Sequence, residues 1–384
     1  MLHLLLNADL HAPERIGRRH LLVAGSTVVY VGTEAPDLGN VPVETVDFGG
    51  WRVLPGLIDG HAHLTGGGGE AGPETKVPSP TLTSFTLAGV TTAVGVLGTD
   101  DLTRTTSELV TRVRALRAEG LSAYCHTGGY HLPPTTLTGS VKSDIVHLDC
   151  VLGVGEVAIS DHRSSQPTFE EIARLASEAH VAGLMTGKAG ILHLHLGDGT
   201  RGLELVTRCL DETEIPARVF NPTHVNRRKE LFSEACDLAQ RGCTIDVTAF
   251  PKQSDDEWSA AEAIRRYQDL GLPDDTITVS SDGGGCLPVF NAQGEVTSMD
   301  VGRSAALFER IRELLRAGRP LESFLPAFTS NVARLLRLPK KGRLAEGSDA
   351  DLVVLDPDRD IQHVMARGRW YVRDGAPVVR GTFE

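Results

Sequence analysis

Short apolar runs alternate with amphipathic helical patterns through the middle of the chain, and this alternation constrains the fold more than any other feature. The strand-like runs include SAYCHTGG, EVAIS, ILHLHLG, CTIDVTA and TITVSS. The segments between them, such as FEEIARLASEAHVAG and RKELFSEACDLAQRG, place apolar residues on one helical face. Repeated strand–helix units build a parallel sheet, which is either closed as a barrel or open and doubly wound.

Polar side chains that can bind metals recur at the ends of these strand-like runs, and they favour the barrel. They are His61 and His63, Tyr130, Glu156, His195, His224 and Asp282. In a (β/α)₈ barrel the carboxyl ends of the strands carry the chemistry. We therefore predict an α/β protein built on a TIM (β/α)₈ barrel.

The two chain ends differ from the middle, because both read as short strands broken by glycines. HLLVAGSTVVYVG predicts a hairpin near the start, and DADLVVLDP and HVMARGRWYVRDG predict strands near the end. A barrel needs about 250 residues, so a chain of 384 residues has room for a second module. We predict a barrel over residues 55–340 and a small β-sandwich domain formed by residues 1–54 and 341–384.

The composition of the chain argues against some kinds of binding partner. The formal net charge is -12, which argues against nucleic acid and anionic membranes. No apolar run approaches the roughly 18 residues of a membrane span, and the start of the chain does not read as a targeting segment. The six cysteines form no CxxC pair, which is typical of reduced thiols. We expect a cytoplasmic protein with no nucleic acid or membrane partner.

LPGLIDGHAHL supplies the first pair of candidate metal ligands. Residues two apart on a strand point to the same side, so His61 and His63 can bind one ion together. His193 and His195 share a face for the same reason. We choose His195 as the ligand because it is nearer the strand end, and we assign His193 to packing or to support of a ligand. A single buried histidine is usually structural, but histidines at several strand ends point to a metal site.

Asp282, in TVSSDGGG, is the candidate carboxylate of this site. A carboxylate at the mouth of a metal site can bind the ion and also move the proton of the attacking water. The alternative interpretation is an Asx turn before the glycines.

The motifs PGLIDGHAHL, the later single histidines and the late aspartate resemble the amidohydrolase superfamily. More narrowly, HLTGGGGEAGP, GVLGTD, TGGYHLP, AISDHR, PTHVNR and SSDG look like the isoaspartyl (β-aspartyl) dipeptidases, in the family's order and over nearly the whole chain. The resemblance implies hydrolysis of a small dipeptide substrate at two metal ions and a homo-oligomer, with an octamer as one implied size.

The resemblance also implies a role for each site residue. His61, His63 and Asp282 would bind one metal, and His195 and His224 would bind the second. Asp282 would also take the proton of the nucleophilic water, and Tyr130 would polarise the scissile carbonyl. The substrate contacts would be Glu70 for the α-ammonium, Arg163 and Arg227 for the carboxylates, and Thr99 nearby. An isoaspartyl dipeptide carries one free ammonium and two carboxylates, and arginine suits carboxylates because its fork is bidentate.

The chain departs from the resemblance at two positions. Family members carry a carboxylated lysine between the metals, whereas no lysine occurs in residues 143–187. Counting back from the arginine of SDHR places Glu156 there, and counting from upstream places Gly155 there, because the segment holds one extra residue. Glycine has no ligating side chain, so we predict a Glu156 bridge on a bulged or shifted strand. The second departure is Cys286, where the family has a serine near the substrate.

We expect two zinc ions per chain, since zinc accepts nitrogen and carboxylate ligands. The sequence leaves manganese, iron and cobalt open, and a single-metal site is the alternative. The rival functions are another amidohydrolase reaction, such as N-acyl-amino-acid deacylation or cyclic-amide hydrolysis, and a non-catalytic scaffold. Glu70 discriminates among the reactions, because only a substrate with a free α-amino group needs it. The presence of the four histidines together with Glu156 and Asp282 argues against the scaffold.

Overall fold

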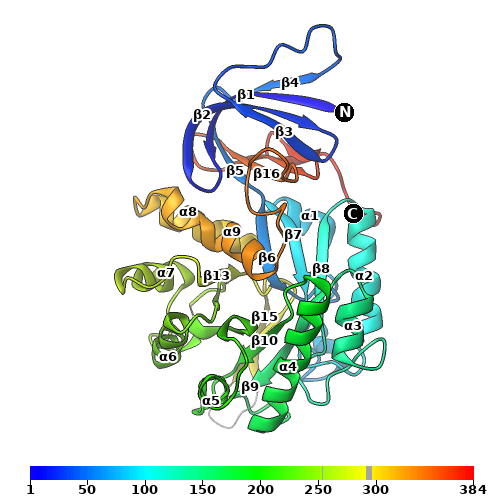
Figure 1. The fold of residues 1–384 in the computed structure, drawn as a ribbon, viewed down its shortest axis with the longest axis vertical. Coiled ribbons are helices and arrows are strands. Elements are labelled where there is room, and N and C mark those ends of the chain that lie inside the picture. Colours follow the sequence, from blue (N-terminus) through cyan, green and yellow to red (C-terminus); the bar gives the residue numbers. More distant parts are fainter. Residues whose placement is uncertain (253, 291–295) are drawn as a thin grey trace.

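The computed structural model describes residues 1–252, 254–290 and 296–384 (Figure 1). Eight successive parallel strands form the centre of the molecule, as the alternating pattern predicts. They are β6 (Leu57–Ala62), β7 (Val90–Gly95), β8 (Ser122–Thr127), β9 (Val151–Ile159), β10 (Ile191–Leu196), β11 (Phe220–Thr223), β12 (Ile245–Thr248) and β13 (Ile277–Ser280).

These strands make a TIM-like barrel. Their backbone hydrogen bonds form two parallel sheets. Strands β6 to β11 follow one another in a six-stranded sheet, and β12 pairs with β13. The end of β13 returns to β6 through a parallel bridge between Ala62 and Gly283. The His61 carbonyl accepts from the Asp282 amide at 3.1 Å, and the His63 amide donates to the Gly283 carbonyl at 2.8 Å. This closure brings the first and last strands together at one end of the barrel.

Helices lie around the barrel (Figure 1). The long helix α4 shows why the sequence folds this way. Thr168 and Glu171 form a capping box at its start, and Gly187 adopts a left-handed conformation at its end. The helices are α1 (Leu82–Thr86), α2 (Thr106–Ala118), α3 (Val141–His147), α4 (Phe169–Thr186), α5 (Glu204–Glu212), α6 (Lys229–Gln240), α7 (Ala260–Asp269), α8 (Ala305–Arg316) and α9 (Ser330–Leu335). None of the helices in the described ranges combines the length and apolar character that a membrane span requires.

Strands from the two chain ends are joined in one nine-stranded sheet, drawn in blue and red in Figure 1. Its strands are β1 (Leu2–His11), β2 (Arg15–Ala24), β3 (Thr27–Gly32), β4 (Glu44–Asp47), β5 (Arg52–Pro55), β16 (Leu352–Leu355), β17 (Ile361–Ala366), β18 (Arg369–Arg373) and β19 (Ala376–Pro377). The predicted hairpin is confirmed as β2 and β3, and β5 joins the two ends by pairing with β1 and β16.

This sheet has an apolar core of its own, which includes Leu5, Leu21, Val53 and Leu352. Residues from both chain ends therefore contribute to one terminal sheet and to its core. The ladders of the described residues unite its strands in a single sheet, and the sandwich arrangement and the boundaries 1–54, 55–340 and 341–384 stay predictions.

A hairpin of β14 (Cys286–Phe290) and β15 (Val296–Val301) leaves the barrel directly after β13. The remaining elements are short 3₁₀ turns at Pro73–Thr75, Ala217–Val219, Val225–Arg227, Leu321–Ser323 and Leu325–Phe328. The hairpin and the turn after β11 lie where the barrel strands end, and both contribute residues to the site.

Candidate metal centre and substrate pocket

The four predicted histidine ligands converge inside the carboxyl end of the barrel. His61 belongs to β6 and His63 follows that strand, so both point inward. His195 lies near the end of β10, and His224 follows β11 in a left-handed conformation with φ 61°. All four side chains are buried. The barrel thus brings together residues that are far apart in the sequence.

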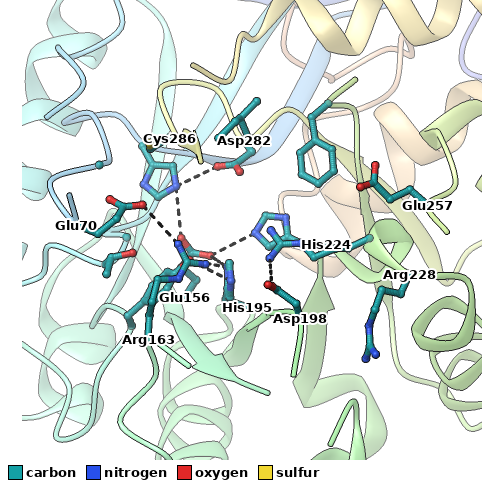
Figure 2. A pocket seen from close by; sticks show the side chains of 18 of the residues that line it. Glu70, Glu156, Arg163, His195, Asp198, His224, Arg228, Glu257, Asp282 and Cys286 are labelled. Carbon is teal, nitrogen blue, oxygen red and sulfur yellow. Dashed lines mark hydrogen bonds and ion pairs between the residues drawn. The ribbon is translucent and has the colours of Figure 1, made fainter. Parts of the chain in front are cut away.

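Glu156 lies between the two pairs of histidines and presents one carboxylate oxygen to each. Oε1 is 3.6 Å from His61 Nε2 and 3.4 Å from His63 Nε2. Oε2 is 3.0 Å from His195 Nδ1 and 3.5 Å from His224 Nε2. Figure 2 shows this carboxylate close to His195 and His224. A carboxylate placed in this way can contact two ions at once.

A bulge in β9 sets the position of Glu156, as the extra residue in the sequence predicts. Between β10 and β9, Leu192 pairs with Val154 but Leu194 pairs with Val157, so β9 holds an additional residue at this point. Gly155 fits there because a Cβ atom at this position would lie 2.5 Å from the His193 carbonyl oxygen.

One expectation about Glu156 was wrong. It does not end its strand but lies inside β9, which continues to Ile159. The strand continues because Ala158 still pairs with His195 of β10 and donates to the Tyr130 carbonyl.

Asp282 completes the candidate metal centre from the turn after β13. Its left-handed backbone, with φ 53°, is followed by glycines. Its Oδ1 lies 3.0 Å from His63 Nε2 and 3.5 Å from His61 Nε2. Three overlapping groups of buried side chains can therefore hold a metal ion. They are His61, His63 and Glu156; His61, His224 and Asp282; and Glu156, His195 and His224.

Unsatisfied polar atoms show that this centre suits a cation. His61 Nε2 and Asp282 Oδ1 are buried and have no hydrogen-bond partner among the described residues. A buried polar atom left without a partner costs free energy, and a divalent ion would satisfy both at once. The nitrogen and carboxylate donors also suit zinc and related metals.

The protonation of the site favours metal ligation. Burial lowers the pKa of His195 to about 3 and holds the pKa of His224 well below its ordinary value, so both rings are neutral. Burial and the neighbouring Asp282 charge raise the pKa of Glu156 well above its ordinary value. The pKa of Asp282 is held well below its ordinary value, because the contacts with His61 and His63 outweigh its burial. A bound cation would stabilise the ionised form of both carboxylates.

In three of these histidines, the ring nitrogen that faces away from the metal centre has a specific hydrogen-bond partner. His61 Nδ1 meets His193 Nε2 at 2.8 Å, His224 Nδ1 meets Thr248 Oγ1 at 2.7 Å, and His195 Nε2 meets Asp161 Oδ2 at 3.1 Å. Such partners fix the ring orientation and the tautomer of a metal ligand. His193 therefore contacts a candidate ligand and, among the described residues, belongs to none of the three metal-binding groups, so its supporting role stays a prediction.

A cavity of about 400 Å³ opens beside the metal centre, and every predicted substrate residue lines it. These residues are Glu70, Thr99, Tyr130, Arg163, Arg227 and Cys286. Figure 2 places Glu70, Arg163 and Cys286 on one side of Glu156 and Asp198 and Glu257 on the other. The pocket therefore has room for a small, highly charged molecule.

Tyr130 directs its hydroxyl group toward the metal centre. Its Oη lies 2.9 Å from His195 Nδ1, and Arg163 stacks over its ring at 5.6 Å. Burial raises the pKa of Tyr130 well above its usual value, so the hydroxyl keeps its proton. It can therefore donate a hydrogen bond to an oxygen that enters the site.

Charged side chains flank the metal centre on both sides. Arg163 Nη1 lies 3.5 Å from Glu70 Oε1, and Arg227 Nη1 lies 3.5 Å from Asp198 Oδ1. The second oxygen of Glu70 is buried without a hydrogen-bond partner in the described parts of the chain. Burial raises the pKa of the Cys286 thiol to about 11, so it is neutral near pH 7. The pocket thus offers both signs of charge to a substrate.

Sequence reasoning missed Asp161, which pairs with Arg163 at 2.7 Å and with His195. It stands in the SDHR motif beside Arg163, and that proximity was the available signal. Asp198, Phe250 and Glu257, which also line the pocket, carried no such signal, since the segments after two different strands, β10 and β12, bring them there.

The chain is similar to known proteins of one family. Residues 52–371 match the model of the amidohydrolase family. A β-aspartyl dipeptidase from the thermophilic, keratin-degrading Fervidobacterium islandicum AW-1, solved in complex with β-Asp-Leu, is 42% identical with a TM-score of 0.94. The match covers 98% of this chain and 97% of that one. A second structure of the dipeptidase from this organism is 40% identical, covers 98% of both chains and has a TM-score of 0.91.

Curated relatives are more distant and longer. Adenine deaminase 2 of Rhizobium johnstonii is 25% identical over 356 residues, which are 89% of this chain and 52% of the relative. The chain thus spans about half the length, or less, of the curated relatives that it matches. The family model covers most of the chain, including all the barrel strands. The chain therefore belongs to the amidohydrolase family.

Proposed function

We propose that this chain hydrolyses β-aspartyl (isoaspartyl) dipeptides at a centre of two divalent metal ions. One observation carries the proposal. Glu156 turns its two oxygens to two separate histidine pairs, directly beside a pocket that contains Glu70, Arg163 and Arg227. The similarity to a β-aspartyl dipeptidase solved with β-Asp-Leu supports the same reaction.

Zinc is the metal that we propose, with two ions per chain. His61, His63 and Asp282 would hold one ion, His195 and His224 would hold the other, and Glu156 would bridge them. When bound, the ions supply Lewis acidity and lower the pKa of a water nucleophile. Because Glu156 is already a carboxylate, the centre needs no bicarbonate for assembly.

The remaining residues bind the dipeptide and handle its charges. Glu70 accepts from the α-ammonium group, and Arg163 and Arg227 bind the carboxylates, with Thr99 and Cys286 beside them. The Tyr130 hydroxyl donates to the carbonyl oxygen as negative charge develops there. Asp282 takes the proton of the attacking water at its carboxylate and delivers it to the leaving amine. The products are aspartate and the second amino acid.

The first test combines metal analysis with hydrolysis of β-Asp-Leu and α-Asp-Leu by protein purified without added bicarbonate. We expect about two metal ions per chain and cleavage of the β-linked peptide alone. One ion per chain would overturn the two-metal centre. Bound metal without cleavage of either peptide would move the search to N-acyl and cyclic amides. The homo-oligomeric state and the cytoplasmic location stay predictions from the sequence.

A further inference from the structure

We infer that His193 and Asn221 form a positioning pair that fixes the proton of His61 on Nδ1, so that Nε2 faces the metal centre as an electron-pair donor. The inference rests on the metal centre proposed above. It concerns residues that lie one layer deeper in the barrel than the ligands, where β10 and β11 run side by side.

Asn221 has a fixed orientation because its amide group is bonded at both ends. Its Nδ2 donates to the Thr244 carbonyl at 2.7 Å. Its Oδ1 is thereby turned toward His193 Nδ1, which lies 2.7 Å away. An amide oxygen can only accept, so the proton of His193 sits on Nδ1.

The second step follows from the chemistry of a neutral imidazole, which has one donor and one acceptor nitrogen. His193 is almost wholly buried, with 1% of its surface exposed, and burial favours the neutral ring. With the proton on Nδ1, His193 Nε2 is the acceptor, and it lies 2.8 Å from His61 Nδ1. His61 Nδ1 must therefore be the donor, which leaves the His61 Nε2 lone pair free for a metal ion.

The nature of this support differs from that of the other ligands. His195 is backed by the Asp161 carboxylate, and His224 is backed by the Thr248 hydroxyl. His61 is backed by a neutral imidazole, which orients the ring without adding charge beside Glu156 and Asp282. Strand alternation in ILHLHLG explains the arrangement, since His193 and His195 point to the same side of β10.

The test measures zinc affinity of the metal-free protein by chelator competition, together with the visible spectrum of the cobalt-loaded protein. His193→Leu removes the acceptor, and we expect its zinc Kd to rise about 10- to 100-fold, the usual effect of losing such a partner. His193→Gln keeps an acceptor oxygen near the position of Nε2, so we expect a zinc Kd within about 5-fold of wild type. Thermal unfolding of each metal-free variant reports its stability separately. If His193→Leu does not fold, the zinc Kd of Asn221→Leu tests the same inference, because this substitution removes the acceptor that fixes the tautomer of His193.

The matched control is His126→Asn. His126 is buried and stacks on the His193 ring at a centroid distance of 5.4 Å. Its loss therefore perturbs the packing around His193 but not the hydrogen bonds that link Asn221, His193 and His61. We expect the control to keep the wild-type zinc Kd. The inference is overturned if His193→Leu keeps the wild-type zinc affinity, or if His193→Gln and His126→Asn lose as much zinc affinity as His193→Leu. Either result leaves the metal centre intact. Wild-type protein that binds no zinc overturns the metal centre and the inference together.

Discussion

Nε2 of His195 lies 3.1 Å from Oδ2 of Asp161, on the side of the ring opposite Glu156. The same Asp161 oxygen lies 2.7 Å from Arg163 Nη2. These hydrogen bonds hold the pKa of Asp161 well below its ordinary value, although burial alone would raise it. Asp161 therefore ties a proposed metal ligand to a proposed substrate-binding arginine.

Asp161→Asn keeps the shape of this contact and removes its charge. We expect kcat/KM for β-Asp-Leu to fall about 10- to 100-fold, because His195 loses its anionic partner and Arg163 loses its anchor. The measurement is steady-state kinetics with zinc content determined on the same sample. Asp198→Asn is the matched control, since Asp198 is 61% exposed and pairs with Arg227 at 3.5 Å. Equal losses in the two variants would contradict the role given to Asp161.

The contribution of Asp161 to thermal stability should be lost at low pH. A depressed carboxylate pKa contributes stability above its unfolded value of about 3.9 and loses it as pH falls below that value. We expect wild type to lose more thermal stability than Asp161→Asn between about pH 5 and pH 2. Parallel pH profiles of the unfolding temperature for the two metal-free proteins would show that Asp161 does not contribute.

Glu156→Gln should disable the bridge between the metals. One amide oxygen cannot replace two anionic oxygens, so we expect fewer than two bound metals and a loss of activity of about 1,000-fold or more. Metal analysis and hydrolysis of β-Asp-Leu check both. Wild-type protein should gain nothing from added bicarbonate, and a bicarbonate requirement would contradict a carboxylate bridge made by Glu156.

Tyr130→Phe removes a single hydroxyl from the pocket. If that group binds the developing oxyanion, kcat falls about 100- to 1,000-fold while KM and metal content change little. A rise in KM at constant kcat would instead indicate ground-state binding. Circular dichroism of the variant controls for folding, since the ring itself stays in place.

Glu70→Gln tests the recognition of a free α-ammonium group. A hydrogen bond to a charged group contributes about 1.5–3 kcal/mol, so we expect kcat/KM for β-Asp-Leu to fall roughly 10- to 150-fold. N-acetyl-β-Asp-Leu lacks the charge and should be a poor substrate of both proteins. Efficient cleavage of the acetylated peptide by wild type would favour the N-acyl-amino-acid reaction instead.

Cys286 should resist alkylation at neutral pH. Thiolate is the reactive form, and burial raises the Cys286 pKa to about 11. The rate of modification by iodoacetamide should therefore be low at pH 8 and should rise as pH approaches 11, as followed by peptide mass spectrometry. Fast labelling of Cys286 at pH 7 would show a reactive thiolate. Cys286→Ser, in which the hydroxyl replaces the thiol, should keep the metal content of wild type.

The sequence by itself predicted the barrel and the candidate metal ligands near the strand ends, because these follow from local rules, whereas the candidate substrate residues followed from the family resemblance. Alternating strands and helices predict parallel units, and strand periodicity places His61 and His63 on one side. The carboxyl-end rule then gathers His195, His224 and Asp282 at the same opening. The extra residue near Glu156 was apparent only against the pattern of the family that the sequence resembles, and it corresponds to the bulge in β9.

Only the tertiary structure decided how these residues meet. The division of the Glu156 oxygens between two histidine pairs depends on the register of β9 against β10 and on closure of β13 onto β6. The contact of Asp161 with His195 joins the turn after β9 to β10, and the contact of Asn221 with His193 joins β11 to β10. Their partners are set by three-dimensional packing, so no periodicity along the chain could reveal them.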